Sequence, residues 1–210
     1  MFKEINFQPS DFLSFPVSWS ACKFSELFKP IKSKSKNPED ENILSLTQKG
    51  IIIKDISRNE GQIAESYDDY NLIDIGDISL NPMDLISGWV DISDYNGLIS
   101  PAYFSYRNFR KDIASTEFVV AYLQILYDLK ILFIFGKGLA AHDGRGRWTL
   151  PDRILMNLEI RFPPLDEQKN IINEYQTIKN SFLKQPFINE DITNYLKSLK
   201  VEMITGKAHV

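Results

Sequence analysis

The sequence predicts an α+β protein, in which a mixed α/β domain is followed by a C-terminal helical, coiled-coil-like segment. Up to about residue 163, short β-like runs alternate with turn formers, and one stretch has the apolar spacing of a helix. Beyond Pro163 and Pro164 the pattern changes to narrow apolar stripes, with intervals of three and four residues. We therefore expect two domains, residues 1–163 and residues 164–210.

The strand candidates are short and lie between turn formers. Ile51-Ile52-Ile53 is an apolar run typical of a buried strand, and residues 71–75 and 98–106 are two further candidates. Turn formers separate these runs, at residues 59–61, 81–82 and 96–97.

A helix is predicted from about Thr116 to Lys130, with Ser115 as its N-terminal cap. Apolar side chains recur at helical spacing along it, at Phe118, Tyr122, Ile125, Leu126 and Leu129. Such spacing is typical of the face that a helix packs against a core.

The C-terminal segment predicts two helices. Proline lacks an amide donor and restricts the residue before it, so Pro163-Pro164 ends the first domain. Asp166 and Glu167 follow, and their negative charge would complement the helix dipole at the start of a helix. After Pro186, Asn189 can cap a second helix. The apolar stripes comprise Ile171, Tyr175, Ile178 and Phe182 in the first helix, and Ile192, Tyr195, Leu199 and Met203 in the second. They can pack within their own chain or against another chain, and the residues alone leave both open.

Composition bounds the class of protein. The 210 residues are 43% hydrophobic and 25% charged, which is ordinary for a globular protein. No apolar run approaches the roughly 20 residues that span a bilayer, and the N-terminus lacks a signal-peptide core. The single cysteine, Cys22, excludes an internal disulfide framework and fits a reducing compartment. We expect a cytoplasmic protein without a membrane partner.

Charge is spread unevenly around a net value of −4. Residues 55–94 hold ten acids and one base, whereas residues 130–161 hold six bases and three acids. A further basic cluster is KPIKSKSK, residues 29–36. Such clusters are often solvated loops, so composition alone does not establish binding to nucleic acid.

Most motifs that carry chemistry are absent from the sequence. The two histidines, His142 and His209, have no metal-ligand spacing with the cysteine. Gly136-Lys137-Gly138 does not fit a phosphate-binding loop, and no glycine-rich turn predicts a Rossmann-like pocket. No Gly-x-Ser-x-Gly elbow is present. We therefore expect that the chain itself binds no cofactor.

One pair of acids leaves a catalytic alternative open. Asp152 and Glu159, with Arg161, imitate the carboxylates and the cation of a Mg²⁺-dependent nuclease. That chemistry needs both acids on adjacent strands, where they would hold the metal. The nuclease stays as an alternative hypothesis.

The chain resembles the specificity (S) subunits of type I restriction-modification systems over most of its length. FPVSWSACKFSELF, with Pro16 and Trp19, is similar to the lead-in to their recognition domains. The remaining matches follow in the family's order, at Ile75-Gly76-Asp77, Asn81-Pro82-Met83, Gly88, NGLISPAYFSYR (96–107), RFPPLDEQKNI (161–171) and Ile204-Thr205-Gly206-Lys207. Each motif is weak alone, and the ordered set is quite specific.

The resemblance implies a sequence-specific DNA recognition subunit without catalytic activity. A usual specificity subunit has two recognition domains and two helical regions, and this chain has one of each. The resemblance therefore implies a half-length form that pairs with itself, and a two-part site on double-stranded DNA. It also implies docking to the methyltransferase (modification) subunit, which would bring S-adenosylmethionine, and through the complex to the restriction subunit. Residues 1–163 would be the target-recognition domain, and both helical stripes would form the dimer and docking interface.

Candidate DNA-binding residues follow from charge and loop chemistry. In the loop from Gly136 to Trp148, glycines permit close approach of the backbone, and guanidinium groups can pair with guanine or phosphate. The candidates there are Lys137, Arg145, Arg147 and Trp148. Lys49, Lys54 and Arg58 flank another turn and are candidates for phosphate contact. A scaffold that binds only proteins remains the other alternative to DNA recognition.

Overall fold

The computed structural model describes residues 8–55, 66–85, 88–139, 147–183 and 190–207. Its order of elements mixes strands and helices and closes on two long helices, as the α+β prediction requires. The helices are α1 (Phe24–Leu27), α2 (Thr116–Asp128), α3 (Ile131–Phe135), α4 (Asp152–Met156), α5 (Leu165–Leu183) and α6 (Glu190–Ile204), with 3-10 turns η1 (Pro9–Asp11) and η2 (Pro38–Asp40). Within these residues, no helix has the length and apolar character needed to cross a membrane.

Two four-stranded sheets and two strand pairs make up the β structure of the described residues. The central sheet has the order β2-β9-β6-β7, with the strands β2 (Phe28–Pro30), β9 (Phe104–Asn108), β6 (Ile78–Leu80) and β7 (Val90–Ile92). The distal sheet has the order β4-β3-β8-β5, with the strands β4 (Gly50–Ile53), β3 (Ile43–Thr47), β8 (Gly97–Ile99) and β5 (Asn71–Ile73). The pairs are β1 (Ser20–Lys23) with β12 (Glu159–Phe162), and β10 (Lys137–Leu139) with β11 (Arg147–Thr149).

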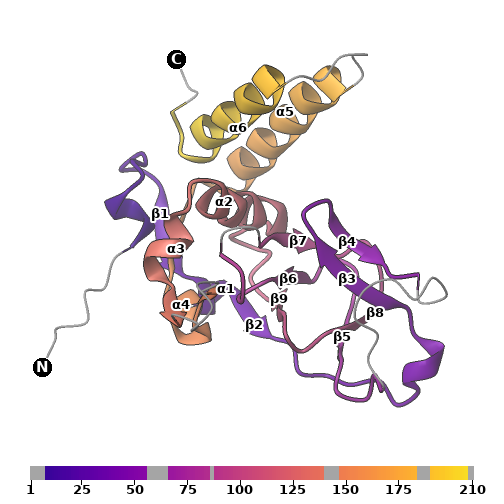
Figure 1. Cartoon of the computed structure of the whole chain (residues 1–210). Coiled ribbons are helices and arrows are strands. Elements are labelled where there is room, and N and C mark those ends of the chain that lie inside the picture. Colours follow the sequence, from indigo (N-terminus) through magenta and orange to yellow (C-terminus); the bar gives the residue numbers. More distant parts are fainter. Residues whose placement is uncertain (1–7, 56–65, 86–87, 140–146, 184–189, 208–210) are drawn as a thin grey trace, which may run out of the picture.

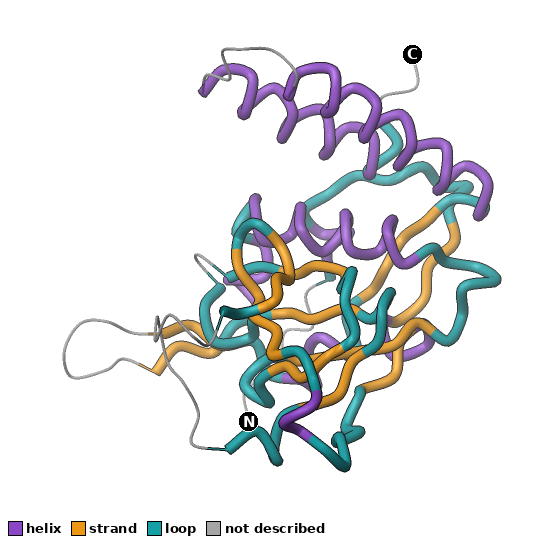
Figure 2. The backbone as a smooth tube through the Cα atoms, turned by 90° about the vertical axis from the view of Figure 1, so that its right-hand side faces the viewer, coloured by secondary structure: helices purple, strands orange, loops and turns teal. Residues whose placement is uncertain are grey.

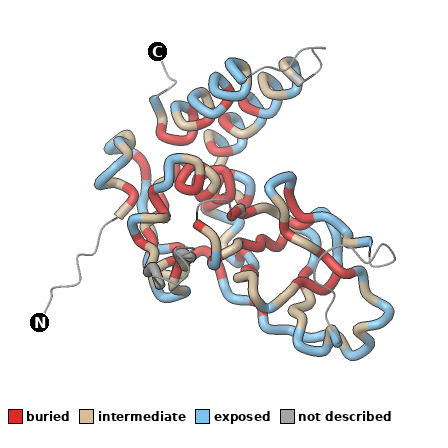
Figure 3. Tube along the Cα trace, in the orientation of Figure 1, coloured by how far each residue is buried: buried red, intermediate tan, exposed pale blue. Residues whose placement is uncertain are grey.

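The sheets lie side by side, and the long helices lie on one side of them (Figure 1). Helix α2 packs on the central sheet, α5 and α6 form an antiparallel helical hairpin against α2, and the distal sheet extends away from them. Buried residues concentrate around α2 and the central sheet (Figure 3). A second, smaller cluster, which includes Leu44, Ile51 and Ile99, supports the distal sheet.

The predicted helix and strands are present with shifted ends, but the prediction that Ile51-Ile52-Ile53 is a buried strand is wrong for Ile52 and Ile53, which are each 45% exposed. Ser115 caps α2 by accepting a hydrogen bond from the amide of Phe118 at 3.1 Å. The strand predicted over residues 98–106 is two strands, because Tyr103 donates its amide to Ser100 O and forms a turn between β8 and β9. The strand predicted over residues 71–75 ends at Ile73, ahead of Gly76, whose φ of +87° does not fit a strand.

The Gly76-Asp77 motif directly precedes β6, an inner strand of the central sheet. Asp77 is 2% exposed, and its carboxylate accepts hydrogen bonds from Arg107 Nε at 2.7 Å and from the amide of Asp74 at 2.8 Å. Arg107 also donates to the carboxylate of Asp74 at 2.6 Å. A buried carboxylate needs such partners, so this motif is structural here.

The buried amide of Gln168 joins the helical hairpin to the domain below it. Its side chain is fully buried, and its Oε1 accepts a hydrogen bond from the amide of Ser115, the cap of α2. Its Nε2 donates to Ile113 O and to Pro163 O, each at 2.8 Å. The first turn of α5 is therefore held to the first turn of α2.

The first prediction concerns the Asp77–Arg107 pair. Arg107→Met should lower the free energy of unfolding by about 1–3 kcal/mol, because it leaves the buried carboxylate without its cation. Urea denaturation measures this change. Arg110→Met is the matched control, since Arg110 pairs with the exposed Asp112, and its midpoint should not move. Equal midpoints for all three proteins would contradict the structural role of the pair.

Candidate nucleic-acid interface

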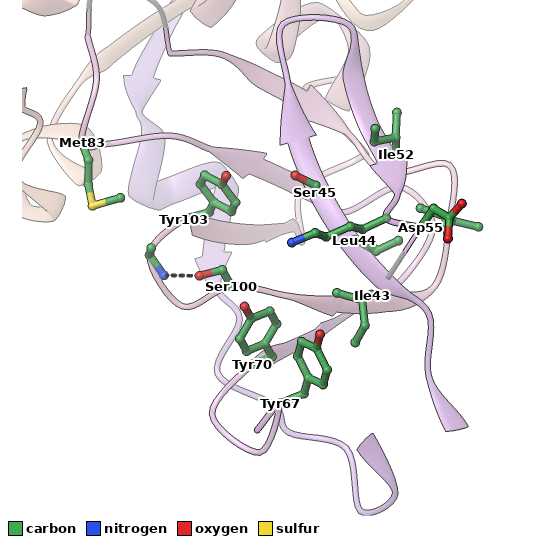
Figure 4. Close-up of a pocket in the computed structure, with 13 residues that line it drawn as sticks. Ile43, Leu44, Ser45, Ile52, Asp55, Tyr67, Tyr70, Met83, Ser100 and Tyr103 are labelled. Carbon is green, nitrogen blue, oxygen red and sulfur yellow. Dashed lines mark hydrogen bonds between the residues drawn. The ribbon is translucent and has the colours of Figure 1, made fainter. Parts of the chain in front are cut away.

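A groove of about 550 Å³ opens on the distal sheet (Figure 4). Strands β3 and β4 form one wall, and the opposite wall comes from Tyr67, Tyr70 and the turn between β8 and β9. We call it the tyrosine groove, because Tyr67, Tyr70 and Tyr103 all line it.

Local turns hold the three tyrosines in place. Tyr70 donates its amide to Tyr67 O at 2.9 Å, and the two rings meet edge to face with centroids 5.0 Å apart. Ser100 Oγ accepts from the amide of Ala102 in the turn that carries Tyr103. Burial raises the pKa of Tyr70, so its hydroxyl keeps its proton at neutral pH and can donate a hydrogen bond.

The groove also presents apolar groups, the cation of Lys54 and the carboxylate of Asp55. Ile52 and Ile53 are each 45% exposed, and Met83 is 37% exposed, although all three are large apolar residues. Lys54 lines the same groove, and its amide donates to Ile43 O at 2.7 Å. Exposed apolar groups beside hydroxyls and an ammonium group are typical of a surface that binds a partner.

The β10–β11 ribbon starts next to this groove. The two strands pair antiparallel, with Lys137 opposite Thr149 and Gly138 opposite Trp148, and the ribbon projects at the left of Figure 2. Its base is fixed by a hydrogen bond of 2.7 Å from the amide of Leu150 to Pro82 O, one residue before Met83. A projecting ribbon and a concave groove therefore share one part of the surface.

The structure places the candidate DNA-binding residues in three ways. Lys54 lines the tyrosine groove, whereas Lys49 lies in the turn between β3 and β4 and lines a different cavity, beside the helical hairpin. These two lysines do not share a surface. Lys137, Arg147 and Trp148 belong to the ribbon, but their side chains lie outside the description. Arg58 and Arg145 lie outside the described residues.

The helical stripes pack largely inside the chain. Ile171, Tyr175 and Met203 are 2%, 9% and 4% exposed and belong to the main core. The expectation that they form a surface between chains is wrong for these three, because α2 and the paired helix already cover them. Ile178, Phe182, Ile192 and Leu199 are half-buried, and Tyr195 is 51% exposed with its ring 5.5 Å from that of Phe182.

The two acids of the nuclease alternative have separate structural partners. Asp152 begins helix α4, and its carboxylate accepts a hydrogen bond of 2.5 Å from the buried Tyr106 hydroxyl. Glu159 lies on β12 and pairs with Arg161 at 2.8 Å. The acids are therefore not on adjacent strands. Among the described residues, no group of three or more His, Cys, Asp or Glu could hold a metal ion.

Sequence reasoning did not identify the tyrosine groove or the role of Gln168. Tyr67 and Tyr70 lie in an acidic stretch, SYDDY, where their spacing of three residues was the available signal. Tyr103 and Gln168 lie within motifs quoted above, but a motif does not show which of its members faces a groove or a core.

Solved structures show what this fold is similar to. An HsdS subunit from Thermoanaerobacter tengcongensis matches 80% of this chain with 16% identity and a TM-score of 0.56. A chain from a study of complex assembly and conformational transition of the type I R-M system matches 95%, with 13% identity and a TM-score of 0.53. The type I restriction-modification S subunit from M. genitalium matches 83%, with 15% identity and a TM-score of 0.50.

The chain shares the fold of type I specificity subunits. The resemblance read from its motifs is thereby confirmed at the level of fold. This chain covers only 43%, 50% and 41% of the three structures' own chains. No family model matches the sequence, and no curated protein is significantly similar to it.

The second prediction separates a structural Asp152 from a metal ligand. Asp152→Ala should lower the free energy of unfolding by about 1–3 kcal/mol, because the buried hydroxyl of Tyr106 loses its acceptor. Adding MgCl₂ should leave the urea midpoint of both proteins unchanged. A midpoint that rises with Mg²⁺ in the parent protein and not in the variant would support the nuclease alternative.

Proposed function

We propose that this chain is the sequence-specific DNA recognition subunit of a type I restriction-modification complex, in a half-length form. The observation that carries the proposal is the structural similarity to S subunits, which extends over 80% or more of this chain. This chain covers only about half of the length of those S subunits. The recognition domain comprises residues 1–163, and the helical segment comprises residues 164–210. The chain directs other subunits to DNA and performs no catalysis itself.

The ribbon and the groove suit different parts of a DNA duplex. The major groove admits a two-stranded ribbon, and guanidinium groups can read guanine there, which is the role proposed for Arg145 and Arg147 with Lys137 and Trp148. The adjoining sugar–phosphate backbone is convex and carries oxygen acceptors. The tyrosine groove offers a concave surface with hydroxyl donors and Lys54, which fix position on the backbone without reading sequence. Arg58 belongs to the same proposed phosphate contacts.

We further propose that two copies of this chain pair with each other. Two copies related by a two-fold axis would present two identical reading surfaces, and therefore recognise a two-part symmetric site. This pairing, and the docking of the methyltransferase subunit, would use the stripe residues that are half-buried or exposed. These residues are Ile178, Phe182, Ile192, Tyr195 and Leu199. S-adenosylmethionine would be bound by that subunit, and the restriction subunit would join through the complex in the cytoplasm.

The third prediction tests the reading surface. The assembly of this chain with its methyltransferase subunit should select one two-part sequence from a library of random duplexes. Arg145→Glu combined with Arg147→Glu should abolish the selection, because reversed charges repel phosphate and lose guanine contacts. The mass of the assembly in solution is the control and should not change. Parent protein that enriches no sequence would contradict the proposal.

The fourth prediction concerns phosphate contact by Lys54. Lys54→Ala should reduce the slope of log K against log salt concentration by about one, since one phosphate contact is lost. Lys49→Ala should leave the slope unchanged, because Lys49 faces the helical hairpin and not the tyrosine groove. Fluorescence anisotropy on the selected duplex gives both slopes. The reverse pattern would place the DNA on the other side of the β3–β4 turn.

A further inference from the structure

Lys200 is a buried cation at the junction of the helical hairpin and the recognition domain. It lies on α6 and is only 8% exposed, in a cavity of about 620 Å³ that is also lined by α2, α5 and β7. Its ammonium group donates a hydrogen bond to Oε1 of Gln124 on α2. Its Nζ lies 6.0 Å from the ring centroid of Trp89, which precedes β7, and 5.8 Å from that of Tyr175 on α5. One side chain thus contacts three other parts of the molecule.

The charge of Lys200 is only partly compensated. The ion pairs found among the described residues do not include it. The pKa of Lys200 is lowered to about 8, chiefly by burial and also by the like charge of Lys179 on α5, while Asp128 on α2 and Asp91 on β7 act in the opposite direction. Glu117, Lys49 and Lys197 also line the cavity. Because the folded pKa lies below that of the unfolded chain, the charge opposes folding below about pH 8, and this cost disappears as the pH rises toward the ordinary lysine value.

Because the buried charge of Lys200 lowers the stability of the fold, its burial is not explained by stability. The remaining contacts between the hairpin and α2 are largely apolar, through residues such as Ile171, Met203 and Ile204. Apolar contacts are not directional, so they allow a helix to shift or rotate on its neighbour. A buried polar bond can select one register among these alternatives, at a cost in stability.

Lys200 and Gln168 hold the hairpin to α2 at two separate positions. Gln168 fixes the first turn of α5, and Tyr175, against which Lys200 packs, lies seven residues further along the same helix. At 1.5 Å per residue the two fixed points are roughly 10 Å apart. A second polar contact away from Gln168 restricts rotation of the hairpin about its first fixed point.

We propose that Lys200 is a positioning residue that fixes the angle between the helical hairpin and the recognition domain. If the hairpin carries the two-fold interface, that angle also sets the separation of the two reading surfaces, and so the spacer in the DNA site. The consequence for DNA rests on the proposed function, whereas the angle itself does not.

The angle is measured first, on the full chain without DNA. Cysteines for spin labels replace the exposed Asn194 on α6 and Glu39 near the distal sheet, in a Cys22→Ser background. Pulsed electron resonance gives the distribution of distances between the labels. Lys200→Met should make this distribution roughly twofold broader while the melting temperature stays equal or rises, because a buried charge is replaced by an apolar side chain. Lys169→Met, at an exposed lysine of α5 that does not line this cavity, should change neither quantity.

The DNA consequence is measured on duplexes with the selected half-sites and different spacers. The parent assembly should prefer one spacer over its neighbours by roughly tenfold, which corresponds to about 1.4 kcal/mol, and Lys200→Met should lose most of this preference with half-site choice unchanged. An unchanged distance distribution in Lys200→Met overturns the proposal, as does a lower melting temperature with the parent distribution. A broadened distribution with an unchanged spacer preference overturns the link to DNA. Parent protein that selects no DNA refutes the proposed function and leaves the angle measurement valid.

Discussion

The buried amide of Gln168 is the interaction on which the arrangement of this molecule depends. It satisfies the amide of Ser115 and the carbonyl groups of Ile113 and Pro163 within one side chain. An unpaired buried amide would be costly, so the start of α5 and the start of α2 hold one relative position. Because α2 packs on the central sheet, the same contact places the helical hairpin relative to everything that the sheet supports.

This arrangement separates the surfaces available for binding. The tyrosine groove and the ribbon lie on the sheet side, joined through the bond between Leu150 and Pro82. The helical hairpin lies across α2 (Figure 1), with Ile171, Tyr175 and Met203 of its apolar stripes buried. A protein that reads DNA and also recruits other subunits needs such a separation, since neither surface then obstructs the other. The acidic residues of the central part do not conflict with this role, because several of them are used in structural pairs such as Asp77 with Arg107.

Much of the fold could be predicted from the sequence, and less of the candidate site. Helix α2 was recognisable because Ser115 is a cap and a full apolar face follows it. The start of helix α5 just after Pro163-Pro164 was recognisable because proline ends regular structure. Periodicity shows that Ile171 and Met203 are buried, but not whether their own chain or another one buries them. The tyrosine groove depends on bringing residues 67, 70 and 103 together across a sheet, which no local pattern encodes. The role of Lys200 is similarly hidden, because a lysine among surface lysines gives no signal of burial.

In the proposed function, this chain determines which DNA sequence a methyltransferase subunit modifies. This role is tested most directly by mapping methylated bases on plasmid DNA after treatment with the methyltransferase subunit and S-adenosylmethionine, with and without this chain. The account predicts methylation confined to one two-part sequence with a constant spacer, and only when the chain is present. Methylation that is the same without the chain, or that follows no common sequence, would contradict it.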